Sequence, residues 1–315
     1  VAPRNPETLA EAARILRAGG LVAFPTETVY GLGADATNGE AVARIFEAKG
    51  RPRFNPLIVH VRSLEDAKAH AAFDAAAEKL ARHFWPGPLT LVVPRKSDTP
   101  LSELVSAGLD TVALRVPAHP LAQELLAATG LPLAAPSANA SGRISSTSAA
   151  HVRESLGDAV DLILDGGATP LGLESTIIGF EGETPVLLRV GAIARQDIEE
   201  LVGQLGAHLD SKVRAPGQLA SHYAPRAAMR LRAKSVGQDE ALLAFGNDVP
   251  HGAAIVQNLS ATGNLREAAA NLFAMLHALD ASGASRIAVM PIPDQGIGEA
   301  INDRLERAAA PRERA

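Results

Sequence analysis

The chain has 315 residues, of which 47% are hydrophobic and 21% charged, so it is long enough for one large globular domain or for a large and a small one. Its formal net charge of −5 and its aromatic content of only 3% argue against a general polyanion binder and against a platform that stacks single-stranded bases. It has no cysteine, which excludes disulfides, a thiol nucleophile and thiolate zinc sites, and no apolar run approaches the roughly 18 residues that span a bilayer, so we expect a cytoplasmic protein.

Short apolar runs alternate with amphipathic helical patterns through the first two thirds of the chain. The first helix is predicted from about Glu7 to Ala18, with two glycines after it, and a buried strand follows at 21–24. Further strands are predicted at 57–61, 89–94, 111–116, 131–135, 162–164, 175–180 and 186–190, and further helices at 39–48, 74–84, 120–129, 148–156 and 195–205. The last three strands have no helix between them, which predicts an antiparallel part of the sheet. Residues 1–205 are therefore expected to form one α/β domain with a large twisted mixed sheet.

A segment of low periodicity follows at 206–227, and its glycines and prolines indicate a linker. Beyond it, strands at 229–232, 253–256 and 286–290 and helices at 265–281 and 298–309 predict a small second α/β domain over residues 228–315. Between Ser211 and Gln238 there are no acidic residues and six basic ones, which are Lys212, Arg214, Arg226, Arg230, Arg232 and Lys234. This cationic segment is either a solvated face or a neighbour of a bound polyphosphate.

The common nucleotide-binding signatures do not account for this sequence. There is no G-x-x-x-x-G-K-[ST] run, so the chain is not a P-loop enzyme. Residues 31–36 fit G-x-G-x-x-A, but residues 25–30 separate them from the preceding strand, which argues against a dinucleotide fingerprint. Neither an H-E-x-x-H motif nor a calcium loop is present, and we expect no metal ligands from the protein.

Loops of small polar residues at strand ends are more informative, because open α/β sheets bind ligands at such edges. The segment 25–33 combines Thr26, Glu27 and Thr28 with glycines that would let a ligand approach closely, although a capped helix entry would look similar. In the segment 136–143, Ser137 and Asn139 follow a strand end. These side chains suit an anion or ribose site, or else a plain turn.

Arginines in two other places suggest an anionic ligand. A helix C-terminus explains Lys49, but it does not explain Arg51, Arg53 and Asn55 in a loop stiffened by two prolines. Arginine forks suit bidentate contacts with phosphate or carboxylate. Arg115 interrupts an apolar strand, so it either faces solvent or meets a carboxylate or a ligand.

Together these segments resemble the threonylcarbamoyl-adenylate synthases, the YrdC-like family, in its long two-domain form. Each segment is weak alone, but their joint occurrence in this order is specific. They are P-T-E-T-V-Y-G-L at 25–32, K-G-R-P at 49–52, N-P-L-I-V-H at 55–60, W-P-G-P-L-T at 85–90, P-S-A-N at 136–139, E-S-T-I at 174–177 and H-Y-A-P at 222–225. The resemblance implies a YrdC-like mixed sheet around an open cationic cavity, a linker over 206–227 that lies across the cavity mouth as a lid, and a small Rossmann-like C-terminal domain.

The resemblance also implies roles for individual residues. The family's K-x-R and S-x-N pairs match the expected catalytic residues Lys49, Arg51, Ser137 and Asn139. Nucleotide contacts are expected from Arg51, Asn55, Thr111, Ser137, Ser145, Arg189 and Tyr223, and threonine contacts from Thr28, His60, Arg115, Ser175 and the backbone of Ala135. The chain departs from the family at 215–220, where S-P-G-M is usual, and at 145–147, where S-P-T is usual.

The implied activity joins L-threonine, bicarbonate and ATP into threonylcarbamoyl-AMP and releases pyrophosphate. Mg²⁺ is expected to arrive with ATP, and the product is expected to pass to a tRNA threonylcarbamoyl transferase complex, without stable nucleic-acid binding by this chain. The alternatives are an RNA-binding or regulatory ATP-binding module of the same fold, and a carbamoyl-transfer domain that acts on another amine. Low aromatic content and net acidity count against the first, and the absence of zinc-finger cysteines counts against the last.

Overall fold

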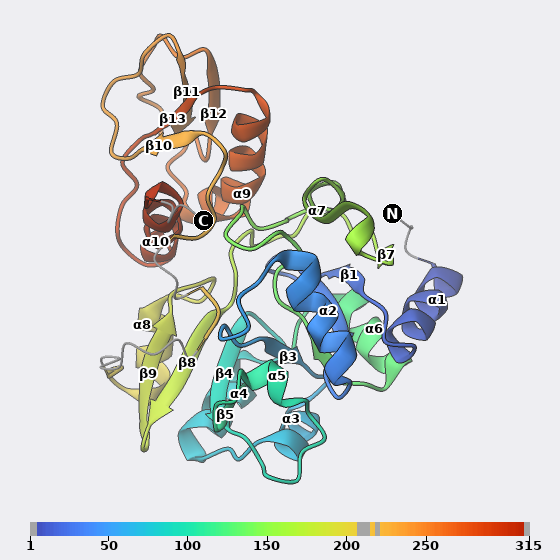
Figure 1. Cartoon of the computed structure of the whole chain (residues 1–315). Coiled ribbons are helices and arrows are strands. Elements are labelled where there is room, and N and C mark those ends of the chain that lie inside the picture. Colours follow the sequence, from blue (N-terminus) through green and yellow to red (C-terminus); the bar gives the residue numbers. More distant parts are fainter. Residues whose placement is uncertain (1–4, 207–214, 218–220, 312–315) are drawn as a thin grey trace.

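The larger of two α/β units is built on a nine-stranded mixed sheet in a computed structural model that describes residues 5–206, 215–217 and 221–311 (Figure 1). The strand order is β7-β1-β2-β6-β3-β5-β4-β8-β9. The strands are β1 (Val22–Pro25), β2 (Tyr30–Asp35), β3 (Ile58–His60), β4 (Leu89–Pro94), β5 (Thr111–Arg115), β6 (Leu133–Ala134), β7 (Leu162–Ile163), β8 (Thr176–Glu181) and β9 (Thr184–Arg189). The predicted mixed sheet is confirmed, and β8 and β9 are antiparallel as expected, but so are β1 and β2, and β4 and β5.

Helices pack against this sheet and supply most of its apolar cover. They are α1 (Pro6–Arg17), α2 (Gly39–Lys49), α3 (Leu64–His70), α4 (Ala75–Phe84), α5 (Glu103–Ser106), α6 (Pro120–Thr129), α7 (Ala149–Leu156) and α8 (Arg195–Val202). The side chain of Asn38 accepts hydrogen bonds at the start of α2, and Gly50 ends that helix in the left-handed conformation at φ +58°. The helix therefore stops with Lys49 buried beneath the sheet edge.

The segment 25–33, which we expected to be a loop, is in part a strand. Residues 26–29 form a short turn, and β2 begins at Tyr30. Its glycines, which suggest a loop, in fact make room for the ring of Phe24, because a Cβ added at Gly33 would lie 2.7 Å from that ring. The sequence also fails to indicate α3, α5 and one strand of the smaller unit. The helix that is predicted to reach residue 205 ends at Val202, before Gly203.

The smaller unit is a four-stranded parallel sheet in the order β10-β13-β11-β12. Its elements are β10 (Ala228–Arg230), β11 (Glu240–Ala244), β12 (Ile255–Asn258), α9 (Leu265–Ala281), β13 (Arg286–Val289) and α10 (Gly298–Ala309). Figure 1 shows α9 and α10 on the side of this unit that faces the larger one. Val29, Ile144 and Leu173 of the larger unit belong to the same buried apolar cluster as Leu272 and Phe273 of α9, so the two units share a core.

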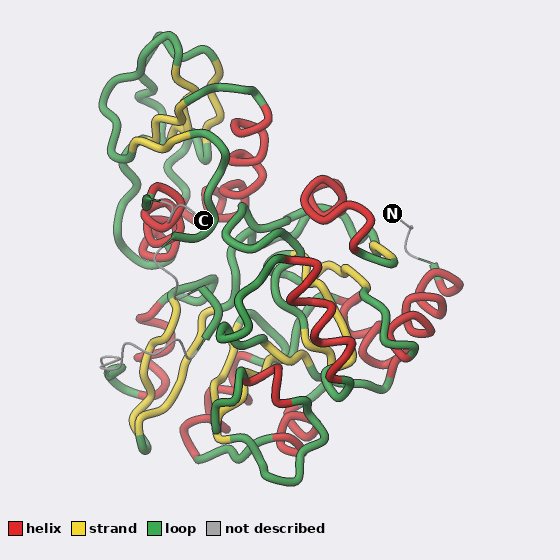
Figure 2. Tube along the Cα trace, viewed as in Figure 1, coloured by secondary structure: helices red, strands yellow, loops and turns green. Residues whose placement is uncertain are grey.

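The predicted linker at 206–227 is described only in part, because residues 207–214 and 218–220, which include Lys212, Arg214 and Gln218–Ala220, lie outside the described residues. Where it is described, it has no helix or regular strand (Figure 2). The backbone N–H of Ala224 donates to the carbonyl of Gly142 at 2.8 Å, and that of His222 donates to the carbonyl of Arg307 at 3.1 Å. This stretch is therefore held between a loop of the larger unit and α10. No helix in the described residues is long and apolar enough to cross a membrane.

Gly191 lies where the chain leaving β9 crosses the backbone that leads into β8. A Cβ at this position would lie 2.5 Å from backbone atoms of Glu174, Ser175 and Thr176. We therefore expect Gly191→Ala to lower the free energy of unfolding by about 1–3 kcal/mol through overpacking, as measured by urea denaturation. The control is Gly39→Ala, whose added Cβ would meet only the Ser102 hydroxyl at 3.4 Å. Equal midpoints for the two variants would contradict the predicted close approach.

Candidate active site

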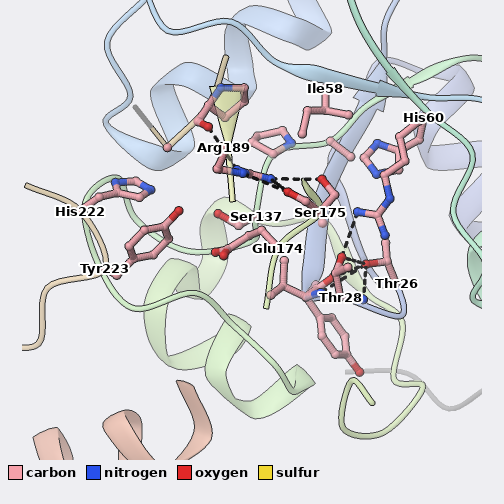
Figure 3. A pocket seen from close by; sticks show the side chains of 18 of the residues that line it. Thr26, Thr28, Ile58, His60, Ser137, Glu174, Ser175, Arg189, His222 and Tyr223 are labelled. Atoms are coloured by element: carbon pink, nitrogen blue, oxygen red, sulfur yellow. Dashed lines mark hydrogen bonds between the residues drawn. The ribbon is translucent and has the colours of Figure 1, made fainter. Parts of the chain in front are cut away.

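A cavity that opens to solvent lies where the strand ends of the larger sheet meet the linker (Figure 3). Nine of the residues expected from the sequence line it, namely Thr28, Arg51, His60, Arg115, Ala135, Ser137, Ser175, Arg189 and Tyr223. They come from the turn after β1, the loop after α2, the ends of β3, β5 and β9, the loops around β6 and β8, and the linker. Figure 3 shows Thr26, Thr28 and His60 on one side, and Arg189, His222 and Tyr223 on the other. The cavity therefore has two chemically different ends.

Arg115 organises the first end, and it is not the solvent-facing residue that the sequence left open. Its side chain is only 4% exposed. One nitrogen donates to the Thr28 hydroxyl at 2.9 Å, a second to the Glu27 carboxylate at 2.6 Å, and Nε to the carbonyl of Gly87 at 3.2 Å. Glu27 thus neutralises the buried charge, and two of the five guanidinium N–H groups remain for a ligand.

His60 faces the same end from the last position of β3. Burial, reinforced by the charge of Arg115, lowers the pKa of His60 to about 3. Its Nδ1 has no hydrogen-bond partner among the described residues. A neutral ring with a free nitrogen can exchange one hydrogen bond with a polar ligand without adding charge.

At the other end, Arg51 and Arg189 line the cavity and Lys49 is buried behind its wall. The described hydrogen-bond partners of these three cations are all uncharged. Lys49 donates to the carbonyls of Ser137, at 2.6 Å, and Asn139. Arg51 donates to the carbonyls of Asn55 and Pro56 at 3.2 and 2.8 Å. Arg189 donates to the Ser175 carbonyl and hydroxyl and to the Pro216 carbonyl at 2.9–3.2 Å (Figure 3). Within the described residues, no carboxylate forms an ion pair with any of the three cations.

Burial and mutual repulsion destabilise the charged forms of these groups. Burial, followed by the charge of Arg189, lowers the pKa of Arg51 to about 10. Burial also lowers the pKa of Arg189, and burial together with the charge of Arg51 lowers the pKa of Lys49 well below its usual value. A bound anion would relieve both effects at once. This end of the cavity is therefore chemically suited to an anion.

Five other residues expected at the site lie outside the cavity wall. Lys49 and Asn139 support the loop at 137–139 from behind, and the Asn139 amide donates to the carbonyls of Ala140 and Arg143. Ser145 donates to the carboxylate of Glu174 at 2.5 Å. Asn55 is buried, and both of its amide atoms lack partners in the described structure.

Thr111 is the fifth of these residues. It begins β5, pairs with Pro94 and lies four residues, or about 13 Å, from Arg115 at the other end of the strand. The structure does not bring it to the cavity wall.

Several lining residues carry no role in the sequence-based prediction. Thr26, Ile58, Glu174 and His222 all line the cavity. Each lies within one of the segments that resemble the family, but the resemblance assigns none of them a role of its own. Burial lowers the pKa of His222 to about 3. Arg304 of α10, whose Nε donates to Glu174 at 2.9 Å, has no sequence signal at all, because 130 residues separate the partners.

Comparisons with known proteins cover both units of the chain. The family model Sua5_yciO_yrdC, described as Telomere recombination, matches residues 14–191, and the model Sua5_C, described as Threonylcarbamoyl-AMP synthase, C-terminal domain, matches residues 193–310. The threonylcarbamoyl-AMP synthase of Pyrococcus abyssi (strain GE5 / Orsay) is 41% identical over 318 residues, or 95% of this chain and 93% of the relative. That of Bacillus subtilis (strain 168) is 42% identical over 332 residues, or 98% and 94%.

Among solved structures, P. abyssi Sua5 complexed with L-threonine resembles the whole chain with a TM-score of 0.89 and 38% sequence identity. The match covers 98% of this chain and 96% of that one. The likeness therefore includes the arrangement of the two units as well as the larger sheet.

The depressed pKa of His60 makes a prediction about stability. The folded protein keeps this ring neutral down to about pH 3, whereas the unfolded chain binds a proton below about pH 6.5, so stability is present above pH 6.5 and is lost as the pH falls. We expect this histidine to contribute a loss of up to about 1.4 kcal/mol per pH unit below pH 6. Urea unfolding at pH 7, 6 and 5 should show a smaller loss in His60→Gln than in the unmodified chain. His83→Gln, which removes an exposed ring, is the control, and identical pH dependence in all three proteins would refute the prediction.

Proposed function

The chain belongs to the threonylcarbamoyl-AMP synthase family in its two-domain form, and we infer that it joins L-threonine, bicarbonate and ATP into threonylcarbamoyl-AMP with release of pyrophosphate. The single observation in the site that carries this inference is that one cavity combines a cationic end with an end suited to an amino acid. Arg51 and Arg189, two buried lining cations that donate no described hydrogen bond to a carboxylate, suit the phosphates of ATP. In the same cavity, Arg115 and neutral His60 suit the carboxylate and polar groups of an amino acid.

The reaction proposed for this cavity needs no protein nucleophile. The threonine amine and bicarbonate give a carbamate with loss of water. A carbamate oxygen then forms a bond to the α-phosphorus of ATP, and the bond to the leaving pyrophosphate breaks. An anion thus attacks a polyanion, so catalysis would consist of orienting the substrates and stabilising negative charge. Arg51 and Arg189 are placed for the second task, because both line the cavity and both are buried.

The other residues would act on position more than on charge. We propose that Arg115 and Thr28 bind the threonine carboxylate, with His60, Ser175 and the backbone of Ala135 completing that end. Lys49 and Asn139 would act through the backbone of the loop that carries Ser137, because their polar groups bond to carbonyls of that loop. Asn55, Thr111 and Ser145 would reach the nucleotide only if it extends beyond the cavity described above.

Magnesium enters this proposal as part of the substrate, carried on the phosphates of ATP with mostly water ligands. The transfer of the product to a tRNA threonylcarbamoyl transferase complex and a cytoplasmic location also remain predictions. The relatives of this chain are synthases, which favours an enzyme over an RNA-binding or regulatory ATP-binding module. The product is a mixed anhydride, so a cavity walled by buried side chains would also protect it from water.

The activity is tested by pyrophosphate release from Mg-ATP with L-threonine and bicarbonate omitted in turn. We expect release only when both are present, because the carbamate is the attacking group. Release with neither would indicate simple ATP hydrolysis. Binding of ATP without any release would favour the regulatory alternative.

Arg51→Ala is expected to lower kcat/KM for pyrophosphate release by about 10²–10³-fold, or about 3–4 kcal/mol, through loss of a buried charge near the phosphates. Arg53→Ala is the matched control, because Arg53 lies two residues away in the same loop but is exposed. Equal turnover in the two variants would remove Arg51 from the proposed site.

A further inference from the structure

Arg304 is a fully buried arginine in α10 of the smaller unit, and its contacts reach into the larger one. Its Nε donates to the Glu174 carboxylate at 2.9 Å, and a second nitrogen donates to the Val190 carbonyl at 2.8 Å. The third nitrogen donates to the neighbouring Asp303 at 2.6 Å. All three guanidinium nitrogens are therefore engaged, and two of them bind groups of the larger unit.

The same guanidinium also covers the ring of Tyr223, a linker residue that lines the cavity. The guanidinium carbon lies 5.1 Å from the ring centroid, within the range of a cation–π contact. The ring stacks on Phe273 of α9 at 5.5 Å and meets His222 edge-on at 4.2 Å. Two residues of the smaller unit thus fix the plane of this ring.

Tyr223 needs such support, because its backbone is in the left-handed region at φ +63°, which is costly for a residue with a bulky side chain. Its hydroxyl is buried and has no hydrogen-bond partner among the described residues. Burial raises the pKa of this hydroxyl to about 12, so it stays protonated and can donate to a ligand. The contacts therefore hold, at the anion end of the cavity, a hydroxyl donor that has no partner among the described residues.

Glu174 is the second residue of the cavity wall that Arg304 contacts. Without a partner, its negative charge would repel an anionic ligand. Its carboxylate lines the cavity near Arg189, but one oxygen accepts from Ser145 and the other from Arg304. Burial alone would raise the pKa of Glu174, but the charges of Arg304 and Arg189 outweigh this effect and lower it. The carboxylate thus remains ionised, with both oxygens turned to protein donors.

We propose that Arg304 is a positioning residue through which the C-terminal domain sets the nucleotide end of the active site, by fixing Tyr223 and by neutralising Glu174. This inference rests on the proposed function, in which that end of the cavity binds ATP. Replacing Arg304 should not change threonine binding. Arg115 lies at the opposite end of the cavity, where Thr28 and Glu27 hold it.

Two variants test the proposal while limiting damage to the fold. Arg304→Lys keeps the positive charge but cannot bind Glu174, Val190 and Asp303 in one fork. The double variant Glu174→Gln with Arg304→Met removes both charges, so no buried charge is left unpaired. The matched control is Arg195→Met with Glu299→Gln. This control breaks another ion pair between the larger unit and α10, of 2.5 Å, away from the cavity wall.

We expect both Arg304 variants to raise the KM for ATP about tenfold, to weaken ATP binding by calorimetry to the same extent, and to leave the KM for L-threonine within about twofold. The control should leave both KM values unchanged. If Arg304 were merely structural, its replacement would instead lower kcat and the melting temperature with both KM values intact, or would shift both KM values equally. Either result would overturn the proposal.

The calorimetric titration separates this inference from the proposed function. If the unmodified chain binds ATP but releases no threonine-dependent pyrophosphate, the synthase assignment fails. A tenfold weaker ATP affinity in Arg304→Lys would still support the positioning role. If the unmodified chain is active and its variants bind ATP equally well, the positioning role fails and the synthase assignment stands.

Discussion

The architecture of the cavity depends on the burial of positive charge without carboxylate partners. Lys49, Arg51 and Arg189 are removed from water, which is costly, and among the described residues they donate hydrogen bonds only to backbone carbonyls and one hydroxyl. Those carbonyls belong to the loops at 55–56, 137–139, 175 and 216, so the same bonds that tolerate the charge also fix the loops. Cation burial and loop geometry are therefore one constraint, and an anion is the ligand that completes it.

At the opposite end of the cavity, the buried positive charge is compensated by a carboxylate. Arg115 is equally buried, but Glu27 neutralises it, and the neighbouring His60 is kept uncharged. A nearly neutral end suits a zwitterion, whose charges must be matched by hydrogen bonds, whereas the cationic end suits a polyanion. On the proposed function, this difference in charge compensation, more than any difference in residue type, would orient the two substrates within one cavity.

Sequence patterns predicted most of the fold and the outline of the site, and the misses have physical causes. The helices at 265–281 and 298–309 were predicted to their observed bounds because their apolar periodicity is regular. The strand β2 escapes prediction because its glycines lower strand propensity while making space for Phe24. The burial of Arg115 could not be decided from sequence, since it depends on where Glu27 lies. The position of Thr111 away from the cavity wall could not be read from its motif either, because a motif does not give distances.

The contact between Arg304 and Glu174 shows why the second domain's contribution to the site escapes sequence reasoning. A fully buried ion pair between the two units is stable only if both backbones are placed accurately, so it couples the folding of one to the geometry of the other. Tyr223 lies between the units, and Gly217, where a Cβ would meet Arg189 and the Tyr223 hydroxyl within 3 Å, lets the linker pack on both. The linker, α10 and the ends of β8 and β9 are thus mutually dependent. None of the described residues of the C-terminal domain lines the cavity, but Arg304 supports its wall from behind through Glu174 and Tyr223.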